Sequence, residues 1–218
     1  MRPGNIDYHL GMSLQEFWRA RANVHTHDYY RGRRLCKMPE DLRTYQHLLE
    51  ESLPDVVLEL GSYDGGSAVW FADQLDIFRG RDLHRPTVVS VDMIQIDYRG
   101  DDRIAFIQGR VDDPATAEQV RPFLVGRRVF VSEDSGHNTT TTTAALKYYA
   151  DFVPAGSWFV VEDGIVDEPD VKLDRYRPGV QPSIEAFLAS EQGKRFSRHW
   201  IQPYGLTTDF GGWLRAEQ

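Results

Sequence analysis

An apolar run that ends in a glycine-rich turn constrains the fold of this chain more than any other stretch. Residues 56–60 read VVLEL and residues 61–66 read GSYDGG, and a helix-compatible segment follows. The run is typical of a parallel strand that is buried on both faces. Glycines allow a tight turn and let backbone N–H groups approach a ligand closely. Taken alone, the stretch also fits a strand–turn–helix unit that binds nothing.

Composition restricts the class of protein. The chain has 218 residues, a formal net charge of -8 and one cysteine, Cys36. This charge disfavours nonspecific binding to nucleic acid, and the basic cluster Arg31, Arg33, Arg34 and Lys37 is expected to be a solvated segment or a substrate-facing edge. One cysteine allows no intrachain disulfide and no cysteine-based zinc site. With no apolar signal segment and no run of the ~20 apolar residues that span a bilayer, we expect a cytoplasmic protein that binds no membrane.

Strand and helix patterns alternate through most of the chain. The predicted strands are 56–60, 87–92, 104–107, 128–132 and 157–161, and the predicted helices among them are 68–78, 114–124 and 142–152. This alternation predicts an α/β fold with a parallel, doubly wound sheet. After a charged loop at 167–182 and a helix at 183–190, residues 196–201 and 206–214 are expected to form a terminal antiparallel pair.

The first 50 residues contain no convincing strand. Ser13 and Glu16 have capping-box spacing before a short helix, and Pro39 begins a second helix that runs to about residue 49. The predicted organisation is a helical cap and substrate-side segment at 1–50, followed by the main domain at 51–218.

Polar residues gather where the predicted strands end, which is where open parallel sheets bind ligands. Asp92, at the end of the second strand, is placed to accept hydrogen bonds from a ribose. The turn at 61–66 does not satisfy the G-x-G-x-x-G fingerprint, so S-adenosylmethionine fits better than NAD or FAD. Asp112 and Asp113 lie where an adenine amino group could be met, but they fit equally well a helix N-cap before Pro114.

A second group of acids follows the fourth and fifth strands. If these two strands are neighbours, Asp134, Glu162 and Asp163 converge, and carboxylates at close range recruit a cation. All-oxygen ligation favours Mg²⁺, with Ca²⁺ or Mn²⁺ as alternatives. The alternative interpretation is a set of unrelated loop acids and a helix cap. His137, three residues after Asp134, is a candidate general base.

Six motifs in order resemble one family. They are Gly32 with KMPEDL at 37–42 and YQ at 45–46; ELGSYDGGSA at 59–68; EDSGH at 133–137; VED at 161–163; PG at 178–179 with IEAFL at 184–188; and TTDFGGWLR at 207–215. The chain, from about residue 30 to residue 215, is similar to the cephalosporin hydroxylase family. Its members are S-adenosylmethionine-dependent O-methyltransferases related to macrocin-type O-methyltransferases.

The resemblance implies a Rossmann-like class I methyltransferase fold and a set of site residues. The resemblance places the methyl donor at residues 61–67 and Asp92. The predicted donor site is therefore Glu59, Gly61, Ser62, Tyr63, Gly65, Gly66, Ser67 and Asp92, with Asp112 and Asp113 as the candidates near the adenine. The implied Mg²⁺ ligands are Asp134, Glu162 and Asp163, and the implied catalytic residues are His137 and Asp134. Relatives often carry Asp-Ser-Asp-His where this chain has Gly136 in place of the second Asp.

The sequence therefore predicts a Mg²⁺-dependent O-methyltransferase. The expected acceptor is a small hydroxylated secondary metabolite or its sugar, and the chain is expected to form a homo-oligomer, as relatives often do. Two alternatives are a hydroxylase and a non-catalytic nucleoside-binding partner protein. A non-haem iron oxygenase requires two histidines and one carboxylate, whereas the acidic group above offers His137 alone. A methyltransferase that needs no metal is a third variant.

Overall fold

The computed structural model describes residues 11–80, 84–98, 100–169, 171 and 174–218. None of the helices in these ranges combines the length and the apolar character needed to cross a lipid bilayer.

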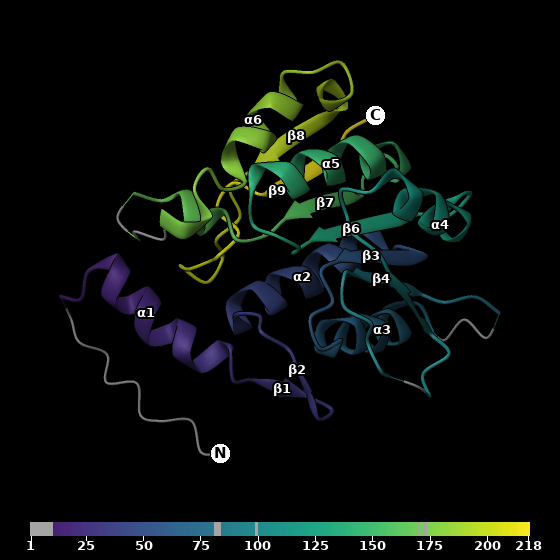
Figure 1. Ribbon diagram of the computed structural model, residues 1–218, viewed down its shortest axis with the longest axis horizontal. Helices are drawn as coiled ribbons and strands as arrows, with labels where there is room; N and C mark the ends of the chain where they lie inside the picture. The colour runs from purple at the N-terminus through teal and green to yellow at the C-terminus, as the bar shows by residue number, and fades with distance from the viewer. Residues whose placement is uncertain (1–10, 81–83, 99, 170, 172–173) are drawn as a thin grey trace.

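A single mixed sheet forms the middle layer of the molecule (Figure 1). Its strands, as far as the structure describes them, are β5 (Ile104–Gln108), β4 (Val88–Asp92), β3 (Val56–Leu60), β6 (Val129–Glu133), β7 (Trp158–Val161), β9 (Trp213–Ala216) and β8 (Phe196–His199), in that spatial order. The first five are parallel to one another, and β9 pairs antiparallel with both β7 and β8. This arrangement confirms the predicted parallel sheet with a terminal antiparallel pair.

Helices cover both faces of the sheet (Figure 1). One face carries α2 (Pro39–Ser52) and α3 (Gly66–Arg79), and the other carries α4 (Pro114–Leu124), α5 (Thr139–Tyr149) and α6 (Gln181–Leu188). Tyr45 and Phe71 are fully buried on the first face, and Tyr149 is fully buried on the second. Because the sheet is covered on both sides, its central strands are mostly apolar, and the polar residues that they carry, such as Glu59 and Ser132, are buried.

The N-terminal segment confirms one local prediction and corrects another. Ser13 and Glu16 cap α1 (Leu14–His25) reciprocally, since the Glu16 carboxylate accepts from the Ser13 N–H at 2.8 Å and the Ser13 hydroxyl accepts from the Glu16 N–H at 3.3 Å. The expectation of no strand is wrong, because β1 (Tyr29–Tyr30) and β2 (Arg33–Arg34) form a two-residue ladder. The ladder is too short to show a pattern in the sequence. The division at residue 50 stays a prediction, and α2 shares its core with α3.

The last strand begins later than expected. Residues 206–212 are not part of it, because Thr208 donates from its N–H and its hydroxyl to the buried Asp41 carboxylate, at 3.0 and 2.8 Å. Short 3₁₀ helices, Gly164–Asp167 and Asp174–Tyr176, lie at the start of the predicted loop and within it. Side-chain hydrogen bonds across long sequence distances thus replace the extended pattern that residues 206–212 suggested.

Gly61 provides a test of how tightly the ends of β3 and β6 approach. It has φ +104°, and a Cβ there would lie 2.1 Å from the Asp134 carbonyl oxygen. Gly61→Ala is therefore expected to lower the free energy of unfolding by about 3 kcal/mol, from backbone strain and overpacking together. Gly126, with φ +72° and no atom within 4 Å of its Cβ position, is the matched control. Gly126→Ala should cost about 1 kcal/mol. Urea unfolding measures both, and equal losses would contradict the close approach.

Candidate active site

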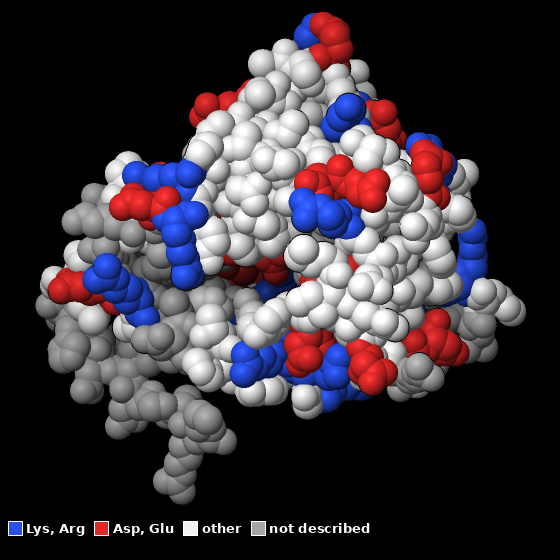
Figure 2. Space-filling view, viewed as in Figure 1, with Lys and Arg blue, Asp and Glu red and all other residues white. Residues whose placement is uncertain are grey.

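Two adjoining hollows open at the carboxyl ends of the parallel strands. The first, of about 120 Å³, is lined by residues after β3, β4, β5 and β6, and the second, of about 560 Å³, extends toward the N-terminal segment. They share Gly61, Asp92, Met93 and Ser135. Figure 2 shows acidic side chains at the floor of a hollow near the centre of the face. A ligand in the first hollow would therefore lie directly beside one in the second.

Asp92 fixes the glycine-rich turn. Its Oδ2 accepts from the N–H groups of Ser62 and Tyr63, at 2.9 and 2.8 Å, and its Oδ1 accepts from the Ile94 N–H at 2.8 Å. Each carboxylate oxygen has room for two acceptor contacts, so Oδ1 keeps capacity for a ligand hydroxyl. The structure brings Gly61, Tyr63 and Asp92 together on the wall of the second hollow, as the sequence predicts.

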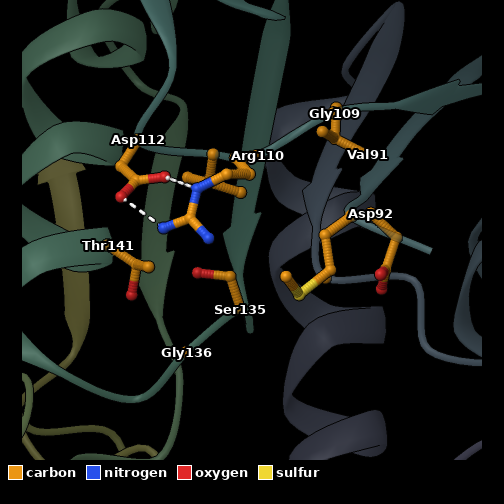
Figure 3. A pocket seen from close by; sticks show the side chains of 11 residues that line it. Val91, Asp92, Gly109, Arg110, Asp112, Ser135, Gly136 and Thr141 are labelled. Carbon is orange, nitrogen blue, oxygen red and sulfur yellow. Dashed lines mark hydrogen bonds and ion pairs between the residues drawn. The ribbon is translucent and has the colours of Figure 1, made fainter.

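The first hollow is lined by one of the two residues predicted to lie near the adenine (Figure 3). Asp112 lines it and is paired with Arg110, with contacts of 2.8 and 2.9 Å. Asp113 instead caps α4, since its side chain accepts from the Ala115 N–H at 2.9 Å. The helix-cap alternative is therefore confirmed for Asp113, which does not line the hollow. Gly136 lines it, and a Cβ there would lie 2.5 Å from the Asn138 Nδ2, so an Asp at this position requires a local shift.

Other members of the predicted donor site lie behind the wall. Glu59 is fully buried and accepts a hydrogen bond from the Ser90 hydroxyl, which also contacts the Ser62 hydroxyl. Gly66 allows the start of α3 to touch the ladder, because a Cβ there would lie 2.1 Å from the Arg34 carbonyl oxygen. Gly65 faces the Phe106 ring, and Ser67 is buried. These two residues are also absent from the lining of both hollows. Contact of these residues with a ligand stays a prediction, and what the structure describes is their packing behind the turn.

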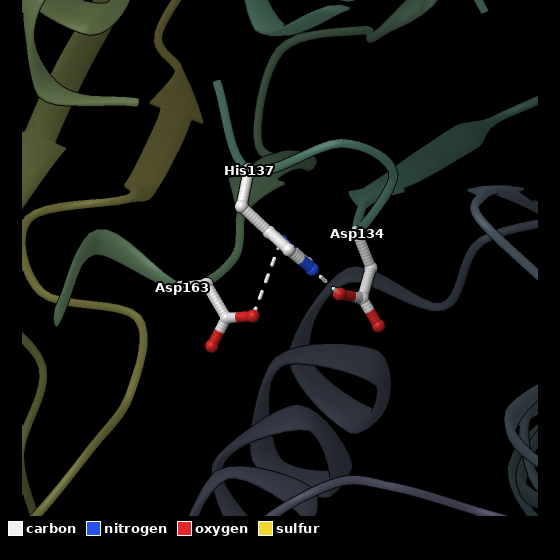
Figure 4. Close-up of side chains that lie close together, drawn as sticks. All are labelled: Asp134, His137 and Asp163. Carbon is white, nitrogen blue, oxygen red and sulfur yellow. Dashed lines mark ion pairs between the residues drawn. The ribbon is translucent and has the colours of Figure 1, made fainter. Parts of the chain in front are cut away.

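An imidazole lies between two carboxylates on the second hollow (Figure 4). The His137 Nδ1 is 3.1 Å from the Asp163 Oδ2 and 3.8 Å from the Asp134 Oδ1. One ligand atom from each of the three residues lies within 4.8 Å of the others. Both His137 and Asp163 have positive φ, +50° and +58°, and the Asp163 N–H donates to the buried Asp209 carboxylate at 3.1 Å. Both residues thus have a backbone conformation that is uncommon for residues other than glycine.

Glu162 is held by three different side chains. Its Oε1 accepts from the Tyr45 hydroxyl at 2.7 Å and from the Ser132 hydroxyl at 2.5 Å. The Lys37 ammonium contacts both of its oxygens, at 2.6 and 2.7 Å, and also donates to the Asp134 Oδ2 at 2.8 Å. The expectation that Lys37 belongs to a solvated segment is wrong, because its side chain is only 2% exposed.

Burial and charge shift the acid–base properties of this group. Burial and the Asp134 carboxylate raise the pKa of Glu162 to about 7, although Lys37 opposes the shift. Burial lowers the pKa of His137, but the carboxylates of Asp163 and Asp134 outweigh it, and the net shift is upward. Burial also raises the pKa of Asp163. These shifts show that the acids repel one another and stabilise positive charge near them.

The donor set fits a hard divalent cation. The predicted ligands Asp134, Glu162 and Asp163 offer carboxylate oxygens, which Mg²⁺ prefers. Among the described residues, the group whose ligand atoms lie close enough to hold one ion is Asp134, His137 and Asp163, so the place of Glu162 among the ligands stays a prediction. The Lys37 ammonium lies between Asp134 and Glu162 and neutralises part of their negative charge.

The sequence did not identify several residues as part of the site. Lys37, Tyr45 and Ser132 hold Glu162, and Asp209 holds the backbone of Asp163. Lys37 lies within the KMPEDL motif and Asp209 within the TTDFGG motif, so motif membership was the one available signal.

Comparison with known proteins identifies relatives of the chain. The profile of the rhamnosyl O-methyltransferase/CmcI family matches residues 22–217. The rhamnosyl O-methyltransferase of Mycobacterium tuberculosis (strain H37Rv) is 31% identical over 171 residues, which cover 75% of this chain and 67% of that protein. A solved apo structure of CmcI is 25% identical, with a TM-score of 0.66 over 88% of this chain and 77% of that chain. CmcI has also been solved with Mg and SAM, at 24% identity, a TM-score of 0.66 and coverage of 88% and 78%; this second likeness supports the fold alone.

If Glu162 is a metal ligand, its pKa predicts that cation binding depends on pH. Mg²⁺ requires the ionised carboxylate, and in the metal-free protein Glu162 ionises near pH 7. Affinity should therefore rise between pH 6 and pH 8, by up to about tenfold per unit below the pKa, with release of protons. Calorimetric titration in two buffers of different ionisation enthalpy measures both effects. Glu162→Gln should bind more weakly and show a smaller pH dependence, and a dissociation constant unchanged from pH 6 to pH 8 would contradict the assignment.

Proposed function

The chain belongs to the rhamnosyl O-methyltransferase/CmcI family, and from this premise we propose that it transfers a methyl group from S-adenosylmethionine to a hydroxyl group in a Mg²⁺-dependent reaction. The observation that carries the proposal is the junction of the two hollows at Gly61 and Asp92, with Asp134, His137 and Asp163 lining the second hollow and not the first. A donor site and an acceptor site thus lie side by side.

The first hollow suits the nucleoside half of the donor. The adenine would lie among Gly109, Asp112 and Thr141, and the ribose would face Asp92, whose Oδ1 retains acceptor capacity. The methionine half would then follow Gly61 and Tyr63 into the second hollow. This path places the reactive sulfonium toward Asp134 and His137.

The residues of the second hollow supply the acid–base chemistry. Mg²⁺ held by Asp134, Glu162 and Asp163 would lower the pKa of the acceptor hydroxyl and offset the carboxylate charge that raises the pKa of His137. His137, in its neutral form, takes the proton from that hydroxyl. Asp163, 3.1 Å from the His137 Nδ1, orients the ring. The walls on either side hold donor and acceptor in line, which contributes through proximity.

The lining of the second hollow indicates a sugar or another polyhydroxylated acceptor. Aromatic rings of Tyr63 and Tyr176 and polar groups of His25, Arg34 and Arg175 face it together. The Mycobacterium relative is named a rhamnosyl O-methyltransferase, and we extend that substrate class, a sugar on a larger molecule, to this chain. A role in antibiotic or other natural-product biosynthesis, a homo-oligomeric state and a cytoplasmic location remain predictions, and light scattering of the purified protein tests the second of these.

The hydroxylase alternative has weaker support. Among the described residues, the group that could hold a metal is Asp134, His137 and Asp163, which contains one histidine. A non-haem iron site uses two histidines and one carboxylate. Consumption of O₂ with iron, in the absence of methyl transfer, would favour the hydroxylase.

Removal of the metal tests the reaction class. Purified protein is incubated with S-adenosylmethionine and a panel of rhamnosylated and other glycosylated acceptors, and methylated product is measured by mass spectrometry. EDTA should abolish product formation and added Mg²⁺ should restore it, because the acidic site would lose the charge that activates the hydroxyl. Full activity in EDTA would support a metal-independent methyltransferase instead.

Removal of the imidazole tests the proposed base. His137→Ala is expected to lower kcat by about 100- to 10,000-fold, because general-base catalysis contributes on this scale. The affinity for S-adenosylhomocysteine should stay within about threefold, since His137 is absent from the first hollow. His47→Ala, on the exposed side of α2, is the control and should keep wild-type rates. An unchanged kcat in His137→Ala would remove His137 from the mechanism.

A further inference from the structure

Lys37 is a charged side chain at the centre of the acidic site to which the proposed reaction gives no role. Its ammonium makes contacts of 2.6 to 2.8 Å with Glu162 and Asp134, and its side chain is 2% exposed. An unpaired lysine at such a depth would be strongly destabilising. The carboxylates therefore hold the ammonium, and the ammonium holds the carboxylates.

The backbone around Lys37 fixes where the ammonium lies. Met38, the next residue, is 1% exposed and packs against Ile165 and Val171. Pro39 then begins α2, the helix that also carries Tyr45. Lys37 and Tyr45 reach Glu162 from the same segment. The position of the ammonium thus depends on the anchored start of α2 and not on a mobile surface chain.

Lys37 reduces the net negative charge of the acidic site. Asp134, Glu162 and Asp163 carry three negative charges when ionised, and Lys37 carries one positive charge. His137, beside Asp163, adds a second positive charge when it is protonated. Lys37 thus lowers the negative charge that Mg²⁺ would meet and keeps the acids together before Mg²⁺ arrives.

We propose that Lys37 is a built-in counter-ion of the metal site: a positioning residue that holds Glu162 and Asp134 together in the metal-free protein and weakens their affinity for Mg²⁺. The inference rests on the proposed Mg²⁺ site. Its consequence is that metal-free protein stays folded and binds Mg²⁺ with moderate affinity, so that the ion is exchangeable.

Two substitutions separate charge from shape. Lys37→Met keeps much of the length and removes the charge, and Lys37→Arg keeps the charge and serves as the matched control. In Lys37→Met, the Mg²⁺ dissociation constant measured by calorimetry should fall by about tenfold or more, because one positive charge leaves the vicinity of the ion. Its melting temperature in EDTA should fall, and Mg²⁺ should raise it more than it raises that of the wild type. Lys37→Arg should bind Mg²⁺ within about threefold of the wild type.

A merely structural role predicts a different pattern. If Lys37→Met binds Mg²⁺ more weakly than the wild type or with unchanged affinity, the counter-ion proposal is overturned. An effect of side-chain shape would appear in Lys37→Arg as well as in Lys37→Met. An effect of charge would appear in Lys37→Met alone, because Lys37→Arg keeps the positive charge. The sign of the change in affinity therefore decides between the two roles.

A double substitution keeps the test valid if Lys37→Met does not fold. Lys37→Met with Glu162→Gln removes both the ammonium and the carboxylate that it neutralises, and the metal-free protein should regain most of its melting temperature. Failure of the double variant to recover stability would contradict the proposal. If the wild type binds no Mg²⁺, the proposed metal fails, but the comparison of melting temperatures still tests whether Lys37 neutralises Glu162.

Discussion

Parallel pairing of β3, β6 and β7 is the constraint on which the site depends. Backbone hydrogen bonding between these three strands continues past their ends. The Asp134 N–H donates to the Leu60 carbonyl at 2.7 Å, and the Glu162 N–H donates to the Glu133 carbonyl at 2.9 Å. These bonds fix the two acids relative to the glycine-rich turn, since Gly61 follows Leu60 directly. A one-residue slip would turn the side chains to the opposite face, so the register and the chemistry of the site are set together.

Electrostatic repulsion is the cost of this arrangement, and neighbouring residues reduce it. Hydroxyl groups of Tyr45 and Ser132 and the Lys37 ammonium stabilise the Glu162 carboxylate. The same acids raise the pKa of His137 and so favour its charged form in the metal-free protein. A divalent cation held by the acids would offset their charge and favour the neutral imidazole that a base requires. On this account the acids, the lysine and the imidazole act as one unit, whose balance is completed by the ion.

The sequence predicts much of the fold and part of the site. The buried strands at 88–92 and 129–133, with acids at or just after their ends, could be predicted from the sequence. Their convergence could be predicted too, because the carboxyl ends of parallel strands lie on the same edge of a sheet. Contacts between distant segments are not visible: Lys37 lies 97 residues from Asp134 and 125 from Glu162. The sequence could not decide the role of Asp113, because an aspartate suits both a helix cap and a contact with adenine. In the structure it caps α4.

A crystal structure of the protein with S-adenosylhomocysteine and Mn²⁺, recorded at a wavelength where Mn²⁺ scatters anomalously, tests the central claim most directly. The account predicts one anomalous peak among the carboxylates of Asp134, Glu162 and Asp163. It also predicts the adenosine in the hollow beside Asp92 and Asp112, with the sulfur facing His137. A peak away from these carboxylates, or a nucleoside bound outside that hollow, would contradict it.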